Sequence, residues 1–400
     1  MARKSNKTAM AFAMQAQTDV FVIPSASLDL YPVSNLNFSI AGITVENPEY
    51  TGSIHKNGPD VVGKTISGSF NINMRPPGGD DVPVANAYIP GRVLKAAKFT
   101  ETIVSAPIPA AAEAIGGAGN TTTAVTLGAT AGTAVDLYKG MALLLPTIIG
   151  PARDKITAIR SYSAAKLAAL METLDLAASG TYQIPKQVSY QRSISESDAP
   201  LLSVSQWLDG MRYDLVNFRI SGLRWVMPVS TRDGATTPTF EVTYTATINS
   251  YGDEATPAIP AKGATPSFKD GKLFVAGKAV GGSNLTVDFG LRTAYAPDPN
   301  YADGSGAGEL VESTTTINMD RQAYLKAQFD TLAMAEGQAY YPVYAQWGYT
   351  GGKLVQVVVP DARFNYQSPT LGQDFITETG DMYVDVFDRN VCINFPYFLA

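Results

Sequence analysis

The clearest pattern along the chain is a two-residue alternation of apolar and polar side chains. It is cleanest in Ile66–Met74, where Ile66, Phe70 and Ile72 share one side, and in Thr239–Ile248. Because successive side chains of a β-strand point to opposite faces, this period predicts half-buried strands of an antiparallel sheet. Shorter runs of the same kind recur at Leu36–Ile40, Val216–Ile220, Lys272–Ala276, Leu285–Phe289, Thr314–Met319, Leu354–Val359 and Tyr383–Phe387.

Two segments have helical spacing instead. A short helix is predicted within Ala85–Lys98. The stronger helix candidate is Asp320–Ala335, whose apolar residues recur every three or four positions. Asp320 is a suitable N-cap and Gly337 a suitable stop. The pattern therefore predicts a mainly β, antiparallel β-sandwich fold with one clear flanking helix.

The middle of the chain has a different character. Residues from about Pro107 to Gly119 are rich in Ala, Gly and Pro and predict a linker. Ser163–Leu176 is ambiguous, because its composition favours a helix whereas its neighbours favour an all-β unit. Short strand candidates surround it: Thr123–Leu127, Lys139–Leu145, Lys155–Ile159 and Thr181–Pro185.

This change in composition and in the pattern of strands predicts one domain interrupted by another. We expect an N-terminal arm at 1–18, a first part of the main domain at 19–116, an inserted small β domain at 117–187 and a second part at 188–400. A long loop rich in Gly and Pro, Asn47–Lys64, separates two predicted strands of the first part. Loops of that length are usually functional or packed on a partner.

The amino-acid composition is unusually low in charge for a protein whose surface is fully exposed to water. The chain has 400 residues, of which 45% are hydrophobic and only 16% charged, against roughly 25% charged in ordinary soluble domains. Such a sparsely charged surface suggests extensive burial against partners. The net charge of −6 argues against a duplex-binding module, which carries a basic face. It is compatible with acidic walls past which nucleic acid slides without sticking.

The near absence of His and Cys excludes several chemistries. One His and one Cys cannot build a His/Cys zinc cage, a disulfide within the chain or a two-histidine metal site. A Ser-His-Asp triad would have to use His55, and no Gly-x-Ser-x-Gly elbow is present. Cys392 alternates with polar residues and is predicted to be a small strand residue. We therefore predict a protein that is not an enzyme and has no catalytic, cofactor-binding or metal residues and no cofactor.

Three further segments resemble functional motifs, but a structural interpretation is favoured for each. Asp298–Glu309 resembles a calcium loop, but Ala302 and Asp303 interrupt the required pattern, so a polar connection is predicted. Gly277–Gly282 lacks the ending of a phosphate loop, so a hairpin turn is predicted. The aromatic residues between Tyr340 and Tyr349 suit a sugar-binding surface, although such alternation more often belongs to a core or a subunit interface.

The N-terminus and the apolar runs indicate no membrane segment. Arg3, Lys4 and Lys7 precede a mildly apolar Thr8–Met14, a weak likeness to a signal peptide, and a disordered basic arm is the favoured interpretation. The longest apolar run, Met141–Leu145, is far shorter than the ~18 residues of a spanning helix.

Several blocks together resemble the tail tube, or major tail, proteins of long-tailed bacteriophages with non-contractile tails (the siphophage type). The blocks combine strands with Gly and Pro, and cover most of 19–105 and 213–390. They are Asn47–Gly52, Gly58–Lys64, Thr65–Met74 ending in Arg75–Gly79, Tyr213–Trp225, Thr239–Ile248, Leu273–Gly277, Leu285–Gly290, the predicted helix from Asp320, and Lys353–Phe364.

The segment Thr123–Pro185 is similar to a small β module found inserted or appended in phage structural proteins. The residues on which this likeness rests are Thr126–Thr130, Tyr138–Met141, Ile156–Tyr162 and Thr181–Ile184. That likeness implies a strand at Lys166–Met171, against its helix propensity. The insertion is the main departure from a simple tube subunit.

The resemblance implies a structural virion protein. Copies of this chain, most often six, would close a ring by joining their sheets, and stacked rings would form the tail tube, the conduit for DNA ejection. The Asn47–Lys64 loop and residues 1–18 would bridge rings, and double-stranded DNA would pass through the lumen without specific binding. Implied partners are the chain itself and the tape-measure, tail terminator and baseplate proteins. Assembly would occur in the host bacterial cytoplasm, and the final location would be the virion tail.

Two alternatives stay open at the level of sequence. One is another ring-forming tail component, such as a terminator or a baseplate hub. The other is a secreted or surface β protein that binds or cleaves carbohydrate.

Overall fold

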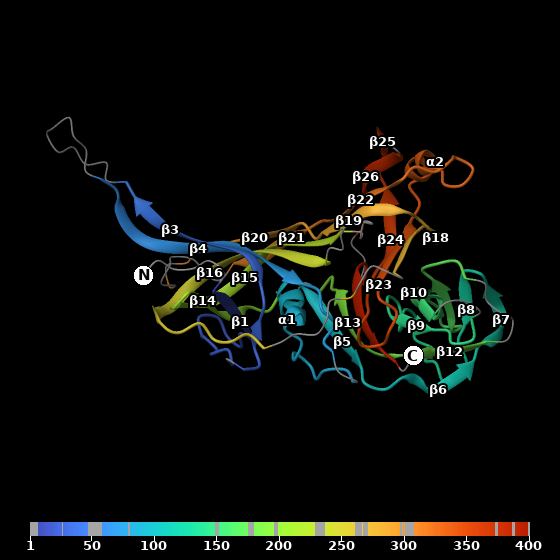
Figure 1. Cartoon of the computed structure of the whole chain (residues 1–400), viewed down its shortest axis with the longest axis horizontal. Helices are drawn as coiled ribbons and strands as arrows, with labels where there is room; N and C mark the ends of the chain where they lie inside the picture. The colour runs from blue at the N-terminus through green and yellow to red at the C-terminus, as the bar shows by residue number, and fades with distance from the viewer. Residues whose placement is uncertain are drawn as a thin grey trace.

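The computed structural model describes residues 7–25, 27–46, 58–78, 81–148, 152–174, 180–195, 199–228, 237–260, 266, 271–296, 298, 300, 308–372, 375–385 and 389–398. Within these residues the chain is mainly β and its sheets are antiparallel, which confirms the predicted fold class. Figure 1 shows an elongated molecule with a projecting hairpin at one end and a small separate sheet at the other.

The main body is one continuous sheet that folds into two layers. The first is here called the arm-bearing layer, because it carries the projecting β3–β4 hairpin. It consists of β1 (Thr8–Met14), β2 (Leu30–Tyr31), β3 (Ser34–Val45), β4 (Asp60–Asn73), β14 (Leu202–Leu208), β15 (Met211–Pro228), β16 (Thr239–Asp253), β19 (Gly282–Asp288), β22 (Thr315–Gln322), β25 (Ser368–Leu371) and β26 (Ile376–Val384). The second, the module-bearing layer, consists of β5 (Phe99–Val104), β13 (Lys186–Arg192), β17 (Lys272–Val275), β18 (Lys278–Ala279), β23 (Tyr341–Trp347), β24 (Val355–Phe364) and β27 (Cys392–Tyr397).

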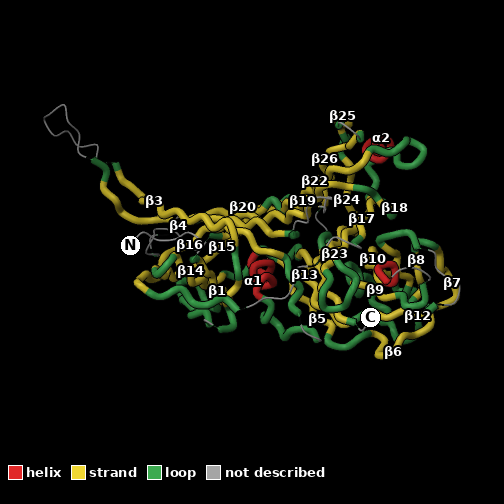
Figure 2. The backbone as a smooth tube through the Cα atoms, in the orientation of Figure 1, coloured by secondary structure: helices red, strands yellow, loops and turns green. Residues whose placement is uncertain are grey.

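Strand β24 joins the two layers. Its first half pairs with β27, as in Val357 opposite Ile393, and its end pairs with β26, as in Phe364 opposite Met382. The helix α1 (Ile89–Ala96) lies beside the strands, where the pattern predicts a short helix (Figure 2). A two-stranded sheet of β20 (Leu291–Ala294) and β21 (Glu309–Ser313) completes the body (Figure 1).

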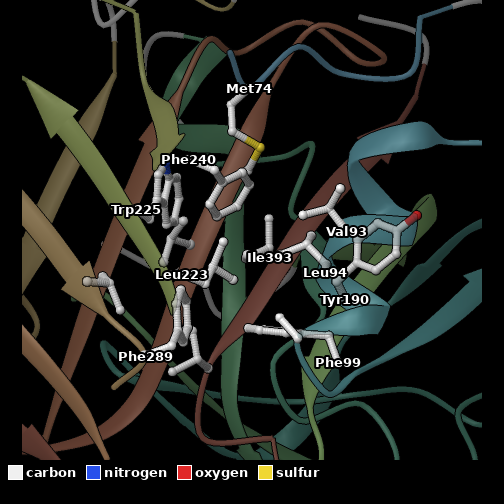
Figure 3. Close-up of a cluster of buried hydrophobic side chains, with 14 of the residues drawn as sticks. Met74, Val93, Leu94, Phe99, Tyr190, Leu223, Trp225, Phe240, Phe289 and Ile393 are labelled. Atoms are coloured by element: carbon white, nitrogen blue, oxygen red, sulfur yellow. The ribbon is translucent and has the colours of Figure 1, made fainter. Parts of the chain in front are cut away.

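The core lies between the two layers. Its contacts across the gap are mostly aromatic: the rings of Trp225 and Trp347 are 6.0 Å apart, and those of Phe99 and Phe289 are 5.2 Å apart. Figure 3 shows Ile393 between Leu94 of α1 on one side and Trp225 on the other. The burial of such rings removes large apolar areas from water and stabilises the sandwich.

A second sheet, here called the module, has seven strands and its own core. Their order is β6 (Ile108–Ala114), β12 (Thr181–Ile184), β9 (Ala142–Leu144), β10 (Ile156–Tyr162), β11 (Leu167–Leu170), β8 (Ala124–Thr126) and β7 (Gly116–Thr121). The short 3-10 helix η1 (Ala152–Lys155) precedes β10. The strand implied at Lys166–Met171 is confirmed by β11.

The predicted linker at Pro107–Gly119 is wrong. Its residues form β6 and β7, which are the two edge strands of the module. Small Ala and Gly side chains have weak strand preference, but pairing with a neighbour overrides it. The module's strands therefore begin at Ile108 rather than at the expected boundary of 117, and β13 belongs to the main body.

The module enters the body at the end of a strand pair. Its flanking strands β5 and β13 are antiparallel neighbours, and Val104 lies opposite Gln187. All of the module is thus inserted where a short hairpin turn would connect β5 to β13. Such a junction leaves the register of the main body unaffected.

The module covers a polar row of the module-bearing layer. Gln356 lies between Asn394 and Gln346, and Lys272 follows Gln346 across the strands. These side chains donate to backbone carbonyls of the module: Asn394 Nδ2 to Gly140 O at 2.6 Å, and Lys272 Nζ to Ile156 O at 3.0 Å. Buried polar groups need such partners.

A buried ion pair fixes the same junction. Lys272 Nζ donates to Glu172 Oε1 at 2.7 Å, and both side chains are almost fully inaccessible to solvent. Burial raises the pKa of Glu172, and the attraction of Lys272 opposes that rise. Because both charges are desolvated, either one alone would be costly.

The N-terminal segment differs from the expected disordered arm at 1–18. Thr8–Met14 forms β1, which pairs with β14 along its whole length. Met10 and Phe12 face the core, and the intervening Ala11 faces Trp207 on the other side. Small and large apolar residues alternate here, so both faces are buried and the pattern resembles neither a surface strand nor a helix.

The predicted helix at Asp320–Ala335 is also wrong in extent. Residues up to Gln322 belong to β22, and the helix α2 is Thr331–Glu336. The Asp320 carboxylate accepts from Thr379 Oγ1 at 2.6 Å, whereas Asp330 is the N-cap, with its side chain accepting from Ala333 N. Pairing of β22 on both sides outweighs the local helix signal. The stop at Gly337 is confirmed, since it is the C-cap.

The substitution Lys272→Met should lower the free energy of unfolding by about 3 kcal/mol, because it leaves Glu172 buried without its partner. Burial raises the pKa of Glu172 in the folded chain, and removal of the Lys272 charge, which opposes this rise, should raise that pKa further. The loss should therefore be smallest below the unfolded value of ~4.3 and grow as the pH rises through the folded pKa. Urea unfolding at pH 5 and pH 8 measures the difference. The double variant Lys272→Met/Glu172→Gln is the control and should recover most of the loss; equal losses at both pH values would contradict the assignment.

Replacing residues 105–186 by Asn-Gly should give a folded main body, because Val104 and Gln187 would then close a two-residue hairpin. The deletion exposes the polar row together with Tyr344, Val358 and Leu354, which pack on the module, so the shortened chain should fold but be less soluble than the full chain. Circular dichroism and a single cooperative thermal transition test this. Removal of 272–279, which takes Leu273 and Val275 out of the core, is the contrasting deletion and should abolish folding. Aggregation of both deletions alike would show that the module is needed by the body.

Candidate assembly surface

The most prominent surface feature is the arm, defined here as the β3–β4 hairpin. Ile40 lies opposite Ile66, and the pairing continues outward to Val45 opposite Asp60. Figure 1 shows the arm running away from the body, at the end opposite the module. The predicted loop at Asn47–Lys64 is thus shorter than expected, because both strands continue by pairing with each other.

The inner half of the arm is anchored and the outer half is not. Phe70 and Ile72 of β4 are completely buried, and β16 pairs with β4 only as far as Ile66. Farther out, Val61 is 73% exposed and Val45 is 53% exposed. An apolar strand pair without a core beneath it is marginally stable alone in water.

Strand β3 is an unprotected edge. It has one neighbour, β4, within the described part of the chain. Its twelve residues, Ser34–Val45, include no charged residue and no proline. Natural proteins usually guard exposed edges with charges, proline or short length, because free N–H and C=O groups pair with other chains. The absence of all three makes β3 a candidate edge for pairing with another strand, although its pairing with β4 shifts register at two places.

The anchor of the arm depends on one glycine. Gly68 packs so closely on Tyr244 that an added Cβ would lie 2.5 Å from the Tyr244 hydroxyl and 2.4 Å from Asn37 O. The Tyr244 hydroxyl in turn donates to Gln206 Oε1 at 3.1 Å. This contact sets where β3 and β4 cross the body.

The outward face of the arm-bearing layer is polar and acidic. Cross-strand partners form an outward row of Asn71, Glu241, Arg224, Asp288, Thr316 and Tyr383 over β4, β16, β15, β19, β22 and β26. Asp320 and Asp381 lie on the same face, and the cation Arg224 pairs with Glu241 at 3.3 Å. The strand alternation that buries one side therefore leaves a mainly negative opposite side.

A second exposed apolar surface lies far from the arm. It belongs to β25 and the start of β26, where Leu371 is 83% exposed and Phe375 is 70% exposed. Strand β25 has β26 as its only partner among the described residues. Figure 1 shows this end projecting from the body beside α2. The strands at both ends of the arm-bearing layer, β3 and β25, thus each have one edge without a partner strand among the described residues.

The residues singled out for chemistry lie partly outside the described part of the chain. His55 lies outside the described residues, as do residues 301–307 of the calcium-like segment Asp298–Glu309. No cluster of three or more His, Cys, Asp or Glu side chains that suits a metal occurs in the part that is described. Cys392 is buried in β27, where the pattern predicts a strand residue.

The remaining motifs have structural roles. Gly277 and Ala276, both with positive φ, make the turn between β17 and β18, which confirms the predicted hairpin. Tyr344 is buried at the module contact and Trp347 in the core, whereas Tyr340 and Tyr349 are each 39% exposed.

The full length of β3 was not predicted from the sequence. The signal was available, since a twelve-residue stretch without charge or proline is unusual beside a Gly/Pro-rich segment. Its strand period was noticed only for Leu36–Ile40, because the outer residues have no core to give them an alternating pattern.

Comparisons with known proteins add no relative. No protein-family model matches the chain, and no curated protein matches it. Among the described residues, none of the helices is long and apolar enough to cross a membrane.

Gly68→Ala should destabilise the chain by about 2 kcal/mol, because its Cβ overlaps backbone as well as the Tyr244 ring. Gly58→Ala is the matched control, since a Cβ at Gly58 meets nothing within 4 Å. Thermal or urea unfolding of both variants gives the comparison. Equal stability of the two would contradict the packing described for the anchor.

Proposed function

We propose that this chain is a structural subunit of a phage tail tube, which polymerises with copies of itself into stacked rings. The observation that carries the proposal is the arm, with its uncharged and unpaired β3 edge. Addition of a strand to such an edge satisfies the backbone groups and gives affinity, while side-chain contacts give specificity. A second copy offers a candidate partner, because the opposite end of the same layer also ends in a strand with one free edge, β25, which pairs only with β26 among the described residues.

Repetition of this contact gives closed or open assemblies. An edge at one end of a layer that pairs with the other end of the next copy is a head-to-tail contact, which makes a ring when the rotation closes. Closing the ring removes the free edges of every copy. The exposed residues Leu371 and Phe375 would then lie near a neighbour rather than in water.

The polar face of the arm-bearing layer supports the same proposal. In a ring of joined layers, one face of that layer lines the lumen. The face that carries Glu241, Asp288 and Asp381 would repel phosphate, so double-stranded DNA would pass without binding. The module sits on the other layer and would lie outside the ring, where it does not obstruct the lumen.

The partners beyond the chain itself follow from the resemblance. A tube of this kind would enclose a tape-measure protein and end on terminator and baseplate proteins. Assembly would occur in the host cytoplasm, and the product would be part of the virion tail. The proposal assigns no catalytic step to the chain.

Purified protein should form rings or tubes in negative-stain electron microscopy. Ile40→Lys places a charge at the middle of the β3 edge, where the side chain is 49% exposed, so folding should be unchanged while the assemblies are lost. Ile23→Lys is the matched control, because Ile23 is 74% exposed outside the arm, and it should assemble normally. The proposal fails if the wild-type chain stays monomeric under all salt conditions, or if both variants assemble equally well.

A further inference from the structure

A cleft of about 170 Å³ lies where three parts of the main body meet. Its walls come from the start of β5, the end of β13, and the junction of β21 with β22, with Val384 of β26 at one side. A water occupies about 30 Å³ of liquid, so the cleft has room for a small polyatomic ion. It is separate from the arm and from the module contact.

Arg192 is the main charged residue of this cleft. It is only 4% exposed, and its guanidinium lies over the rings of Phe99 and Phe289 at 5.4 Å and 5.8 Å from their centroids. Arg192 Nη1 donates to Ala97 O at 2.6 Å, and Nη2 donates to Ser313 Oγ. These neutral partners satisfy two N–H groups and bring no negative charge to the guanidinium.

No carboxylate among the described residues pairs with Arg192. Burial alone lowers the pKa of the Arg192 guanidinium to about 10, without an opposing effect from a nearby acid. The side chain therefore stays cationic at neutral pH. Two other deeply buried cations contrast with it, since Arg321 pairs with Glu378 and Lys272 pairs with Glu172.

The rest of the lining is suited to an anion. Lys98 adds a second cation beside Arg192, because Ser193 N donates to Lys98 O at 3.2 Å. Ser193 and Thr315 line the cleft with hydroxyl groups. The one acid in the lining, Glu312, pairs with Arg292 at 2.8 Å and is more than half exposed.

We propose that this cleft binds one oxyanion, a carboxylate or a phosphate group, between Arg192 and Lys98. A planar guanidinium forms paired hydrogen bonds to such groups, and the two rings hold it in place. Two sources share this chemistry: a free ion such as inorganic phosphate, or an acidic side chain of a second copy of the chain. The inference stands apart from the proposed tail function, although the second source would add a contact to the assembly.

The first test is thermal unfolding of the full chain in inorganic phosphate, against chloride at equal ionic strength. At ten times its Kd, phosphate should raise the Tm of the wild-type chain by about 2 °C. Arg192→Gln should abolish the rise, and Lys98→Gln, at a half-exposed site that does not endanger folding, should reduce it at least twofold. Lys326→Gln, at a side chain that is 87% exposed and far along the chain, is the matched control and should keep the full rise.

The second test separates the two sources. If a neighbouring copy supplies the carboxylate, Lys98→Gln should weaken self-association about tenfold relative to Lys326→Gln in sedimentation experiments without phosphate, and phosphate should compete with assembly. If the ligand is a free ion, the two variants should associate alike while differing in the phosphate response. The proposal is overturned if phosphate has the same effect, or none, on all variants and Lys98→Gln associates as Lys326→Gln does.

Discussion

The alternation of side chains across six strands of the arm-bearing layer is the constraint on which the rest of the structure depends. One row of cross-strand partners is fully buried: Ile72, Phe240, Trp225, Val287, Ile317 and Met382. The adjoining positions of the same strands form the polar outward row. A slip of one residue in any of these strands would exchange the two sets. The core and the acidic face are therefore fixed together by a single register.

The same register explains where the two ends of the layer lie. Since β16 pairs with β4 only from Ile66 to Asn73, the core holds the inner half of β4 and the outer half runs free with β3. At the opposite end β22, β26 and β25 continue the layer past the last contact with β24. The arm and the β25 end are thus consequences of strands that are longer than the core beneath them.

Much of this fold could be predicted from the sequence, and the failures share one physical cause. The half-buried strands, such as Thr239–Ile248, have one face in the core and one in solvent, so their period is visible. Strand β1 is buried on both faces, and the outer part of β3 on neither, so neither shows a period of two. At Asp320 a helix cap and a paired strand were both compatible with the local residues, and pairing on both sides decided it.

The candidate site was less accessible to sequence reasoning, because it depends on what is missing rather than on a motif. The lack of charge in Ser34–Val45 is visible in the sequence, but that those residues form an edge follows only from the sheet order. Arg192 is likewise one of 30 basic residues, and its lack of an acidic partner is a property of the folded chain. Neither feature has a spacing that marks it.

The β3 edge and Arg192 both concern whether a single chain supplies partners for its own polar groups. An uncharged edge exposes backbone groups that prefer a partner strand, and an uncompensated buried guanidinium prefers an anion. The module contact shows the alternative within the same molecule, because there the polar row and Lys272 do find their partners, in the carbonyls and in Glu172 of the module. Lys272 and Asn394 thus find partners within the chain, whereas the β3 edge has no second strand and Arg192 has no carboxylate partner among the described residues.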